Sequence, residues 1–380
     1  MTTIDWRVAQ LVAETVTGTP AHDGDLLPPP SVGELAAEIS RYSHLTLTAQ
    51  PPPIELVDRP RWIAANLNTM KPVLEPLGDR LGTGLGPLAP AARSAAGLLL
   101  GAQVGALTGM LAQRVLGQYD LSLLDDSVQP RLLLLAPNLA EAAANLSLDS
   151  HELTAWVTIH EVTHAVQFSG APWMRGHLGG LLRELIDSMQ VRPANSWGLS
   201  LKDLSALRDI SNLRAEIGEL IAQARRGELL RITLGEDRWT LVDRIQSAMS
   251  LIEGHAEHVM DVVGARVLPS LPELRAALDR RRRTRPLPWR VLERLLGLEL
   301  KMRQYELGRR FCDAVVAEDG PGRLAIAFRS PALLPTSEEL NQPELWMSRT
   351  SSTAAETEAP IHTDGASGED EGGGQVRGET

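Results

Sequence analysis

Cysteine is almost absent from this 380-residue sequence, and aromatic residues make up only 4% of it. The single cysteine, Cys312, excludes a disulfide framework and is typical of a protein that folds in a reducing compartment. It also excludes zinc sites built from several cysteines, so a bound metal would need histidine and carboxylate ligands. Because hydrophobic residues still reach 43%, we expect a sizeable core filled mainly by leucine, valine and alanine.

Basic residues are fewer than acidic ones, and the formal net charge of −11 argues against nucleic acid as a partner. Part of the acidic excess lies in segment 349–380, which is otherwise rich in serine, threonine and glycine. This segment has too few apolar residues to form a core, so we predict a disordered acidic tail. The first residues lack the basic and apolar regions of a signal peptide, and we therefore expect a cytoplasmic protein.

Segment Ser94–Gln113 contains no charged residue and is long enough to cross a bilayer. Gly97, Gly101, Gly105 and Gly109 recur at every fourth position, which would give a helix one flat face for close packing. Glutamine, threonine and glycine lower the hydropathy of the segment, and no basic cluster flanks it. We therefore predict a buried helix in a soluble protein. A membrane-spanning helix is the alternative.

Hydrophobic periodicity predicts a mainly α-helical chain with a small β-sheet. We divide the chain into a helical N-terminal region, 1–120, a second region with the candidate site, 121–348, and the tail, 349–380. The short apolar run Arg131–Ala136 predicts a strand, and Gly235–Thr240 predicts a short strand or turn. Helices are predicted at Arg59–Leu74, Ser150–Phe168, Gly176–Met189, Lys202–Arg226, Leu241–Val263 and Pro288–Ala317.

The sequence from His160 to His164, HEVTH, lies in one of these predicted helices. Residues four apart share a face of a helix, so both imidazoles can reach one tetrahedral zinc ion. Glu161 is rotated away from that face and can instead hold a water molecule and take its proton. Uncharged residues fill and flank the motif, as expected of a buried catalytic helix. A core helix with two hydrogen-bonded histidines is the alternative.

Two histidines leave a zinc site short of a protein ligand, and Glu253 is the best candidate for the third. Glu253 and Glu257 are four residues apart on a predicted helix, near apolar residues that make a buried carboxylate costly without a cation. We expect Glu253 to bind zinc and Glu257 to accept the free ring N–H of a ligand histidine. Two solvated acids on a helix surface are the alternative.

The extended motif of metzincins is absent, because Gln167 and Gly170 occupy its glycine and third-histidine positions. His177 is the nearest other histidine and is a weaker candidate for the third ligand. His255 and His258 project away from the face of the acid pair, and we expect them to be core or surface residues.

The histidine motif, followed by Ala165 and Val166, and the acid pair Glu253-x-x-Ala-Glu257 together resemble the gluzincin branch of zinc metallopeptidases. Most of the chain is also similar to a zincin-like family of actinobacterial proteins labelled zinc-dependent metalloprotease or coenzyme F420 biosynthesis-associated. The stretches with this similarity are Leu116–Asp120, Ala136–Asn138, His160–Phe168, Pro172–Trp173, Glu253–Glu257, Val259–Asp261 and Lys301–Glu306.

The resemblance implies a zinc ion (Zn²⁺) bound by His160, His164 and Glu253, with Glu161 as the general base. Thermolysin-type enzymes have a much shorter connection between the second histidine and the glutamate ligand. Segment 165–252 therefore implies helices inserted between the two ligand helices of a zincin-like fold.

The resemblance also implies an edge strand beside the histidine helix, where an extended peptide substrate would pair. Arg131–Ala136 and Arg231–Leu234 are the candidates for this strand. Tyr305, and less strongly Tyr119, could donate a hydrogen bond in the transition state. The arginine run at 280–283 would suit an anion site or, more simply, a solvated helix end.

These observations favour a zinc-dependent hydrolase, specifically a metallopeptidase acting on a peptide or protein substrate. The alternative is a zinc-stabilised, non-catalytic binding or scaffold protein whose cleft is closed by segment 170–240. The presence of Glu161 in the motif favours the enzyme, because a structural zinc site does not need this carboxylate.

Overall fold

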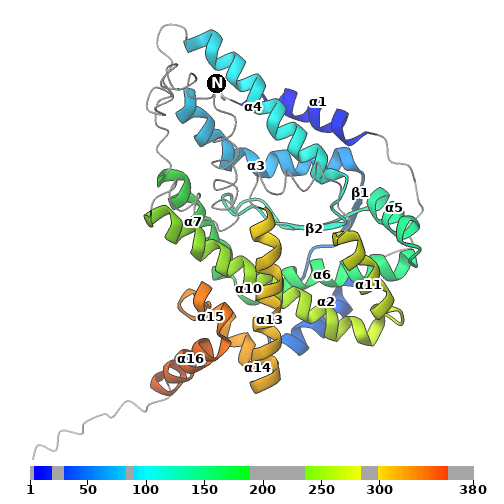
Figure 1. Cartoon of the computed structure of the whole chain (residues 1–380), viewed down its shortest axis with the longest axis vertical. Helices are drawn as coiled ribbons and strands as arrows, with labels where there is room; N and C mark the ends of the chain where they lie inside the picture. Colours follow the sequence, from blue (N-terminus) through cyan, green and yellow to red (C-terminus); the bar gives the residue numbers. More distant parts are fainter. Residues whose placement is uncertain (1–3, 19–29, 83–88, 189–235, 284–297, 358–380) are drawn as a thin grey trace, which may run out of the picture.

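The computed structural model describes residues 4–18, 30–82, 89–188, 236–283 and 298–357. As predicted, the described chain is mainly helical and contains a small sheet. Figure 1 shows the sheet in the middle of the molecule with helices on both sides of it. The helices are α1 (Trp6–Thr17), α2 (Val32–Ser43), α3 (Arg59–Gly82), α4 (Ala89–Ala112), α5 (Ala136–Leu146), α6 (Ser150–Gly170), α7 (Trp173–Ser188), α10 (Glu236–Val267), α11 (Leu271–Arg283), α13 (Leu298–Asp319), α14 (Pro321–Leu324), α15 (Ser337–Asn341) and α16 (Pro343–Thr357).

The sheet consists of β1 (Ile54–Val57), β2 (Gly117–Asp120) and β3 (Arg131–Leu135). Strand β3 lies in the centre, parallel to β1 and antiparallel to β2. The strand predicted at Arg131–Ala136 is therefore confirmed, but its predicted place at an edge is wrong, because both of its sides are paired. The other candidate, Arg231–Leu234, lies outside the described residues. Since β1 and β2 precede residue 121, the sheet joins the two regions predicted before the tail.

Alternate leucines of β3 contribute to two hydrophobic clusters on opposite faces of the sheet. Leu132 and Leu134 belong to the larger cluster, with residues of α2, α6, α10 and α13. Leu133 and Leu135 belong to the smaller cluster, with residues of α1, α3 and α4. A strand covered on both faces is apolar throughout, which explains why the run shows no alternation.

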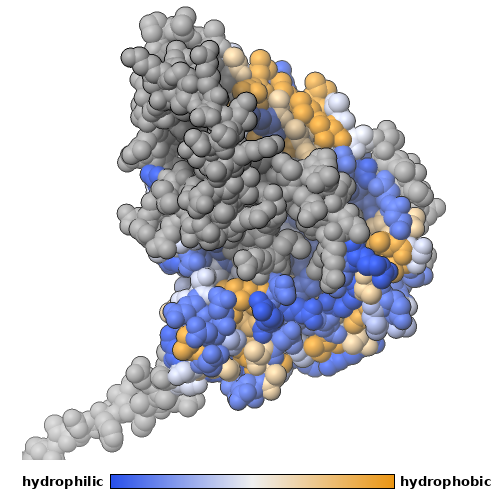
Figure 2. Space-filling model, in the orientation of Figure 1, coloured by the Kyte–Doolittle hydropathy of each residue, from blue (hydrophilic) through white to orange (hydrophobic). Residues whose placement is uncertain are grey.

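Helix α4 contains the uncharged segment, and its glycine face packs against α1. A Cβ atom on Gly101, Gly105 or Gly109 would lie 2.2–2.4 Å from a backbone carbonyl oxygen of Asp5, Ala9 or Ala13. Close packing of this helix pair accounts for the glycine spacing. Figure 2 shows apolar side chains at the molecular surface over α1 and α4. Within the described ranges, no helix combines the length and apolar character that crossing a membrane requires.

The helices predicted within α3, α6, α7 and α10 are present, with shifted ends. Helix α10 begins at Glu236, so the short strand or turn predicted at Gly235–Thr240 is wrong. Trp239 is partly buried and Leu241 is buried, so this first turn already packs on the protein. The predicted helix Lys202–Arg226 lies outside the described residues, as does the first part of Pro288–Ala317.

Helix α16 extends into the segment predicted as a disordered tail. Trp346 is fully buried and donates a hydrogen bond to the carbonyl oxygen of Leu333. One turn later, Arg349 binds both carboxylate oxygens of Glu339 at 2.6 and 2.9 Å. These contacts order the start of a polar segment that composition alone assigns to the tail.

Candidate metal centre

Helix α6 passes through the larger hydrophobic cluster and is buried on most of its surface. Asp149 caps its N-terminus by accepting a backbone hydrogen bond from the first turn. Inside the helix, the hydroxyl groups of Thr158 and Thr163 donate to the carbonyl oxygens of Thr154 and Ile159. Because these hydroxyls find partners within the helix, α6 can lie in the core despite its polar residues.

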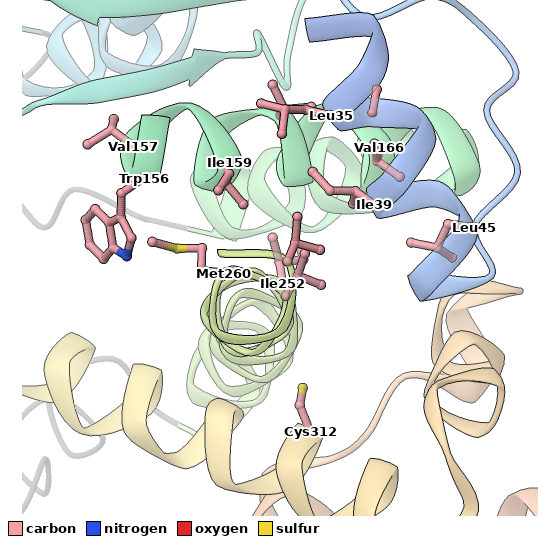
Figure 3. Packing of buried hydrophobic residues seen from close by; sticks show 14 of the residues in the cluster. Leu35, Ile39, Leu45, Trp156, Val157, Ile159, Val166, Ile252, Met260 and Cys312 are labelled. Carbon is pink, nitrogen blue, oxygen red and sulfur yellow. The ribbon is translucent and has the colours of Figure 1, made fainter. Parts of the chain in front are cut away.

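Apolar side chains hold α6 against α10 and α2. Figure 3 shows Ile159 of α6, Ile252 and Met260 of α10, and Ile39 of α2 gathered where these helices meet. Cys312 of α13 belongs to the same cluster and is buried, as expected of a cysteine without a disulfide partner. The two helices that contain the predicted ligands are thus packed by an apolar core.

Three predicted ligands converge between α6 and α10. The Nε2 atoms of His160 and His164 are 3.1 Å apart, and Oε2 of Glu253 lies 3.5 and 3.7 Å from them. Ligand atoms at about 2.0–2.2 Å from a tetrahedral zinc ion are roughly 3.3–3.5 Å from one another. The observed spacing brackets this range, and within the described residues these three side chains form a possible metal-binding group. The donor set therefore fits zinc.

The ligands also stabilise one another electrostatically. Burial alone would raise the pKa of Glu253, but hydrogen bonds to His160 and His164 hold that pKa well below its ordinary value. Burial alone would lower the pKa of His164, but contact with Glu253 raises it to about 9. A cation at this position would interact with the same carboxylate and replace a proton on the imidazole.

Glu161 follows the first ligand, and its carboxylate is directed toward β2. Its Oε2 accepts a hydrogen bond of 2.6 Å from the backbone N–H of Tyr119. The side chain is buried, and burial raises its pKa against the lowering effect of His160 and His164. A backbone donor thus fixes this carboxylate beside the ligands, where a proton acceptor is expected.

Strand β2 can approach α6 closely because Gly117 has no side chain. A Cβ atom there would lie 2.6 Å from Cγ1 of Val157 and 2.9 Å from Cγ of Glu161. The sequence did not predict β2, because four residues with partly buried and polar side chains show no clear periodicity. Its similarity to the zincin-like family was the signal that could have drawn attention to it.

One edge of β2 faces away from β3. The N–H of Leu135 donates to the carbonyl oxygen of Leu116, which sets the alternation of hydrogen-bonded pairs along the ladder. By that alternation, the backbone polar groups of Gly117 and Tyr119 point away from β3. The N–H of Tyr119 reaches Glu161 in this direction. In the described part of the sheet, β2 is therefore the edge strand beside the histidine helix.

Each of the two predicted ligand histidines has a partner at Nδ1 that the sequence analysis missed. Nδ1 of His164 lies 2.9 Å from Oε1 of Gln167, and Nδ1 of His160 lies 2.9 Å from Sδ of Met260. Gln167 follows His164 by three residues and so shares its helix face, a signal that could have identified it. Met260 is on another helix and offers no such local signal.

The structure does not place Glu257 at a ring N–H of a predicted ligand histidine. Gln167 lies at Nδ1 of His164, and Met260 lies at Nδ1 of His160. Glu257 is buried, and its Oε2 lies 3.7 Å from Nη1 of Arg275 on α11. A guanidinium carries a full charge, so it is a stronger partner for a buried carboxylate than a neutral imidazole N–H.

The remaining histidines lie outside this group of ligands. The ring of His177 packs edge-on against Trp173, with the ring centroids 5.8 Å apart. His255 and His258 are both buried, as expected of core residues. Burial lowers the pKa of His255 to about 3, so its ring is neutral.

The two tyrosine candidates have different outcomes. Tyr119 contributes its backbone N–H, while its ring stacks on Phe168 of α6 and burial raises the pKa of its hydroxyl to about 12. Tyr305 is part of α13, but its side chain lies outside the described residues. The side chains of Arg281, Arg282 and Arg283 in the arginine run likewise lie outside the described residues.

Comparisons with known proteins identify one family model and one solved structure that are similar to this chain. The sequence model of the zincin-like metallopeptidase family matches residues 4–347. A crystal structure from Chloroflexus aurantiacus, of a protein proposed to be a hydrolase and described as having a novel fold, is similar with a TM-score of 0.62 and 29% sequence identity. That similarity covers 92% of this chain and 99% of the other. No match was found among curated proteins.

Proposed function

Because the chain belongs to the zincin-like metallopeptidase family, we propose that it is a zinc-dependent hydrolase that cleaves peptide bonds. The observation that supports this most directly is the position of Glu161, a buried carboxylate held beside three zinc ligands. The protein from Chloroflexus aurantiacus, itself proposed to be a hydrolase, points to the same broad class of reaction.

His160, His164 and Glu253 would hold the zinc ion, which, when bound, polarises the scissile carbonyl group and lowers the pKa of a water molecule. Glu161 takes the proton of the attacking water and delivers it to the leaving amine. The N–H of Tyr119 occupies Oε2 of Glu161, which leaves Oε1 for this proton transfer. The hydrogen bond from the Tyr119 N–H keeps the Glu161 carboxylate in position for the attacking water, and no other side chain is needed for this.

The outer edge of β2 is the proposed binding surface for the substrate. The N–H and C=O of Gly117 and the C=O of Tyr119 point away from β3 and can pair with an extended peptide. The backbone N–H of Tyr119 in the same strand binds the Glu161 carboxylate, so a peptide bound there would lie next to the proposed general base. A peptide or protein segment in extended form is therefore the proposed substrate.

Digestion of a peptide library by the wild type and by Glu161→Gln tests this function. The wild type should bind one zinc ion per chain and cleave peptides. The variant should keep its zinc while kcat falls by about 10²–10⁴-fold, the usual contribution of general base catalysis. Glu152→Gln, at the start of the same helix and away from the ligands, is the matched control and should cleave normally.

A zinc-loaded wild type that cleaves no peptide in the library would contradict the proposal. That result would favour the alternative, a zinc-stabilised binding or scaffold protein. Equal cleavage by the wild type and Glu161→Gln would also contradict it, since the proton acceptor would then be another group.

A further inference from the structure

We propose that Gln167 positions two of the three metal ligands, by fixing the ring of His164 and by holding α10 next to Glu253. This inference rests on the proposed zinc centre and concerns how that centre is held. Gln167 lies on α6 and its side chain is fully buried. Its amide must therefore find its hydrogen-bond partners inside the protein.

The amide of Gln167 makes hydrogen bonds to both ligand helices. Its Nε2 lies 2.8 Å from the carbonyl oxygen of Ile252 and 2.9 Å from Nδ1 of His255. Its Oε1 lies 2.9 Å from Nδ1 of His164. The amide thus bridges α6 and α10 on the Nδ1 side of His164, next to the residue that precedes Glu253.

Only one arrangement of hydrogens satisfies these contacts. A carbonyl oxygen can only accept, so the amide atom that faces Ile252 must be the nitrogen. Its second hydrogen points to His255, and Nδ1 of that ring must therefore accept. The amide oxygen can only accept, so Nδ1 of His164 must carry a hydrogen.

With a hydrogen on Nδ1, the neutral ring of His164 has its lone pair on Nε2. That atom lies 3.1 Å from Nε2 of His160 and 3.7 Å from Oε2 of Glu253. This tautomer is the one that a metal ligand acting through Nε2 requires. The hydrogen-bond chain from His255 through Gln167 thus prepares His164 for the metal.

The bond to Ile252 affects the third ligand. Ile252 directly precedes Glu253, so Gln167 ties the backbone of α10 to α6 at the residue before the carboxylate. The other histidine is held differently, because Nδ1 of His160 faces the thioether of Met260, which is a weak acceptor. We therefore expect Gln167 to matter more for zinc affinity than Met260 does.

The hydrogen assignments can be measured on the wild type alone. Long-range proton–nitrogen NMR spectra of zinc-loaded protein with ¹⁵N-labelled histidine report which ring nitrogen carries hydrogen. We expect hydrogen on Nδ1 of His164, and on Nε2 but not Nδ1 of His255. Hydrogen on Nδ1 of His255 would overturn the proposal, because the amide could not then bond as described.

Zinc competition with a chelator tests the effect on the metal. Gln167→Met keeps the length of the side chain without its amide, and we expect zinc affinity to fall by about 10–100-fold. Met260→Leu removes the weaker thioether partner of His160 and should lose less zinc affinity than Gln167→Met. Gln167→Glu keeps an acceptor for His164 and should lose less than Gln167→Met.

Gln167→Met with the zinc affinity of the wild type would overturn the proposal, and so would equal losses in both Gln167 variants. If Gln167→Met does not fold, Gln167→Glu and the wild-type spectra decide the question. A wild type that binds zinc but cleaves no peptide removes the proposed function and leaves this inference standing. A wild type that binds no zinc at this site removes both.

Discussion

At the scale of single residues, the proposed chemistry depends on Gly117, because glycine has no Cβ atom. Any side chain there would press on Val157 and Glu161, the residues of α6 that β2 crosses. The strand must come this close for the N–H of Tyr119 to reach the Glu161 carboxylate at 2.6 Å. Gly117 therefore controls where the proposed proton acceptor lies.

Gly117→Ala should reduce catalysis more than metal binding. Its Cβ would force β2 and Glu161 apart, while the atoms nearest to it belong to Val157 and Glu161 and not to the three predicted ligands. We expect kcat to fall by about tenfold or more, equivalent to about 1.4 kcal/mol, with zinc content unchanged. Gly176→Ala, where a Cβ meets no atom within 4 Å, is the control. Unchanged kcat in Gly117→Ala would contradict this role.

The sequence predicts which three side chains come together better than it predicts their other contacts. Spacing of four within a helix is a local signal, and it is sufficient to pair His160 with His164. Glu253 required the additional resemblance to gluzincins. The roles of Gly117 and Tyr119 depend on how a strand crosses a helix far along the chain, which periodicity does not encode.

At the scale of elements, the position of Glu253 depends on how α10 crosses α13. The two helices meet through glycines: a Cβ on Gly254 would lie 2.1 Å from the carbonyl carbon of Gly308. A Cβ on Gly308 would lie 1.8 Å from the carbonyl oxygen of Ser250. Since these atoms are backbone, a side chain here would have to move a helix. Glu253 is adjacent to this crossing.

Gly308→Ala should both destabilise the protein and weaken zinc binding. Overpacking of this kind costs about 1–3 kcal/mol, and displacement of α10 would move Glu253 away from the histidines. Chemical denaturation and zinc titration measure the two effects. Gly180→Ala, an exposed helical position with open space around it, should instead stabilise by up to about 1 kcal/mol. Equal behaviour of the two variants would contradict the proposed crossing constraint.

Helices and strands were predicted correctly where their own residues determine the structure, rather than contacts with other elements. Strand β3 is apolar after Arg131, and the sequence predicts it correctly, whereas β2 is short and partly polar and was missed. The edge position predicted for Arg131–Ala136 was wrong, because the residues of this run do not show whether the strand is paired on one side or on both. Helix α16 was not predicted, and its second half was assigned to the disordered tail, because the contacts that order its polar residues come from other elements.

At the scale of the whole molecule, the proposed zinc ion joins helices that are far apart in the chain. His160 and His164 belong to α6, which follows the sheet, and Glu253 belongs to α10. The unfolded chain does not hold these ligands together, so binding to the folded state stabilises it. The sequence could predict this connection between α6 and α10 only once Glu253 was predicted as the third ligand.

Zinc should therefore raise the thermal unfolding temperature of the wild type. At free zinc about 100 times Kd, the expected stabilisation is about 2.7 kcal/mol. Differential scanning fluorimetry with and without zinc measures the shift. In the His160→Ala/His164→Ala double variant the shift should disappear, and a shift of wild-type size there would place the stabilising zinc elsewhere.

The most direct test of the central claim is an anomalous diffraction map of zinc-loaded crystals, recorded at the zinc absorption edge. The account predicts one peak about 2.0–2.2 Å from Nε2 of His160, Nε2 of His164 and a carboxylate oxygen of Glu253. A peak coordinated by other side chains, or no peak between α6 and α10 in crystals that contain stoichiometric zinc, would contradict it.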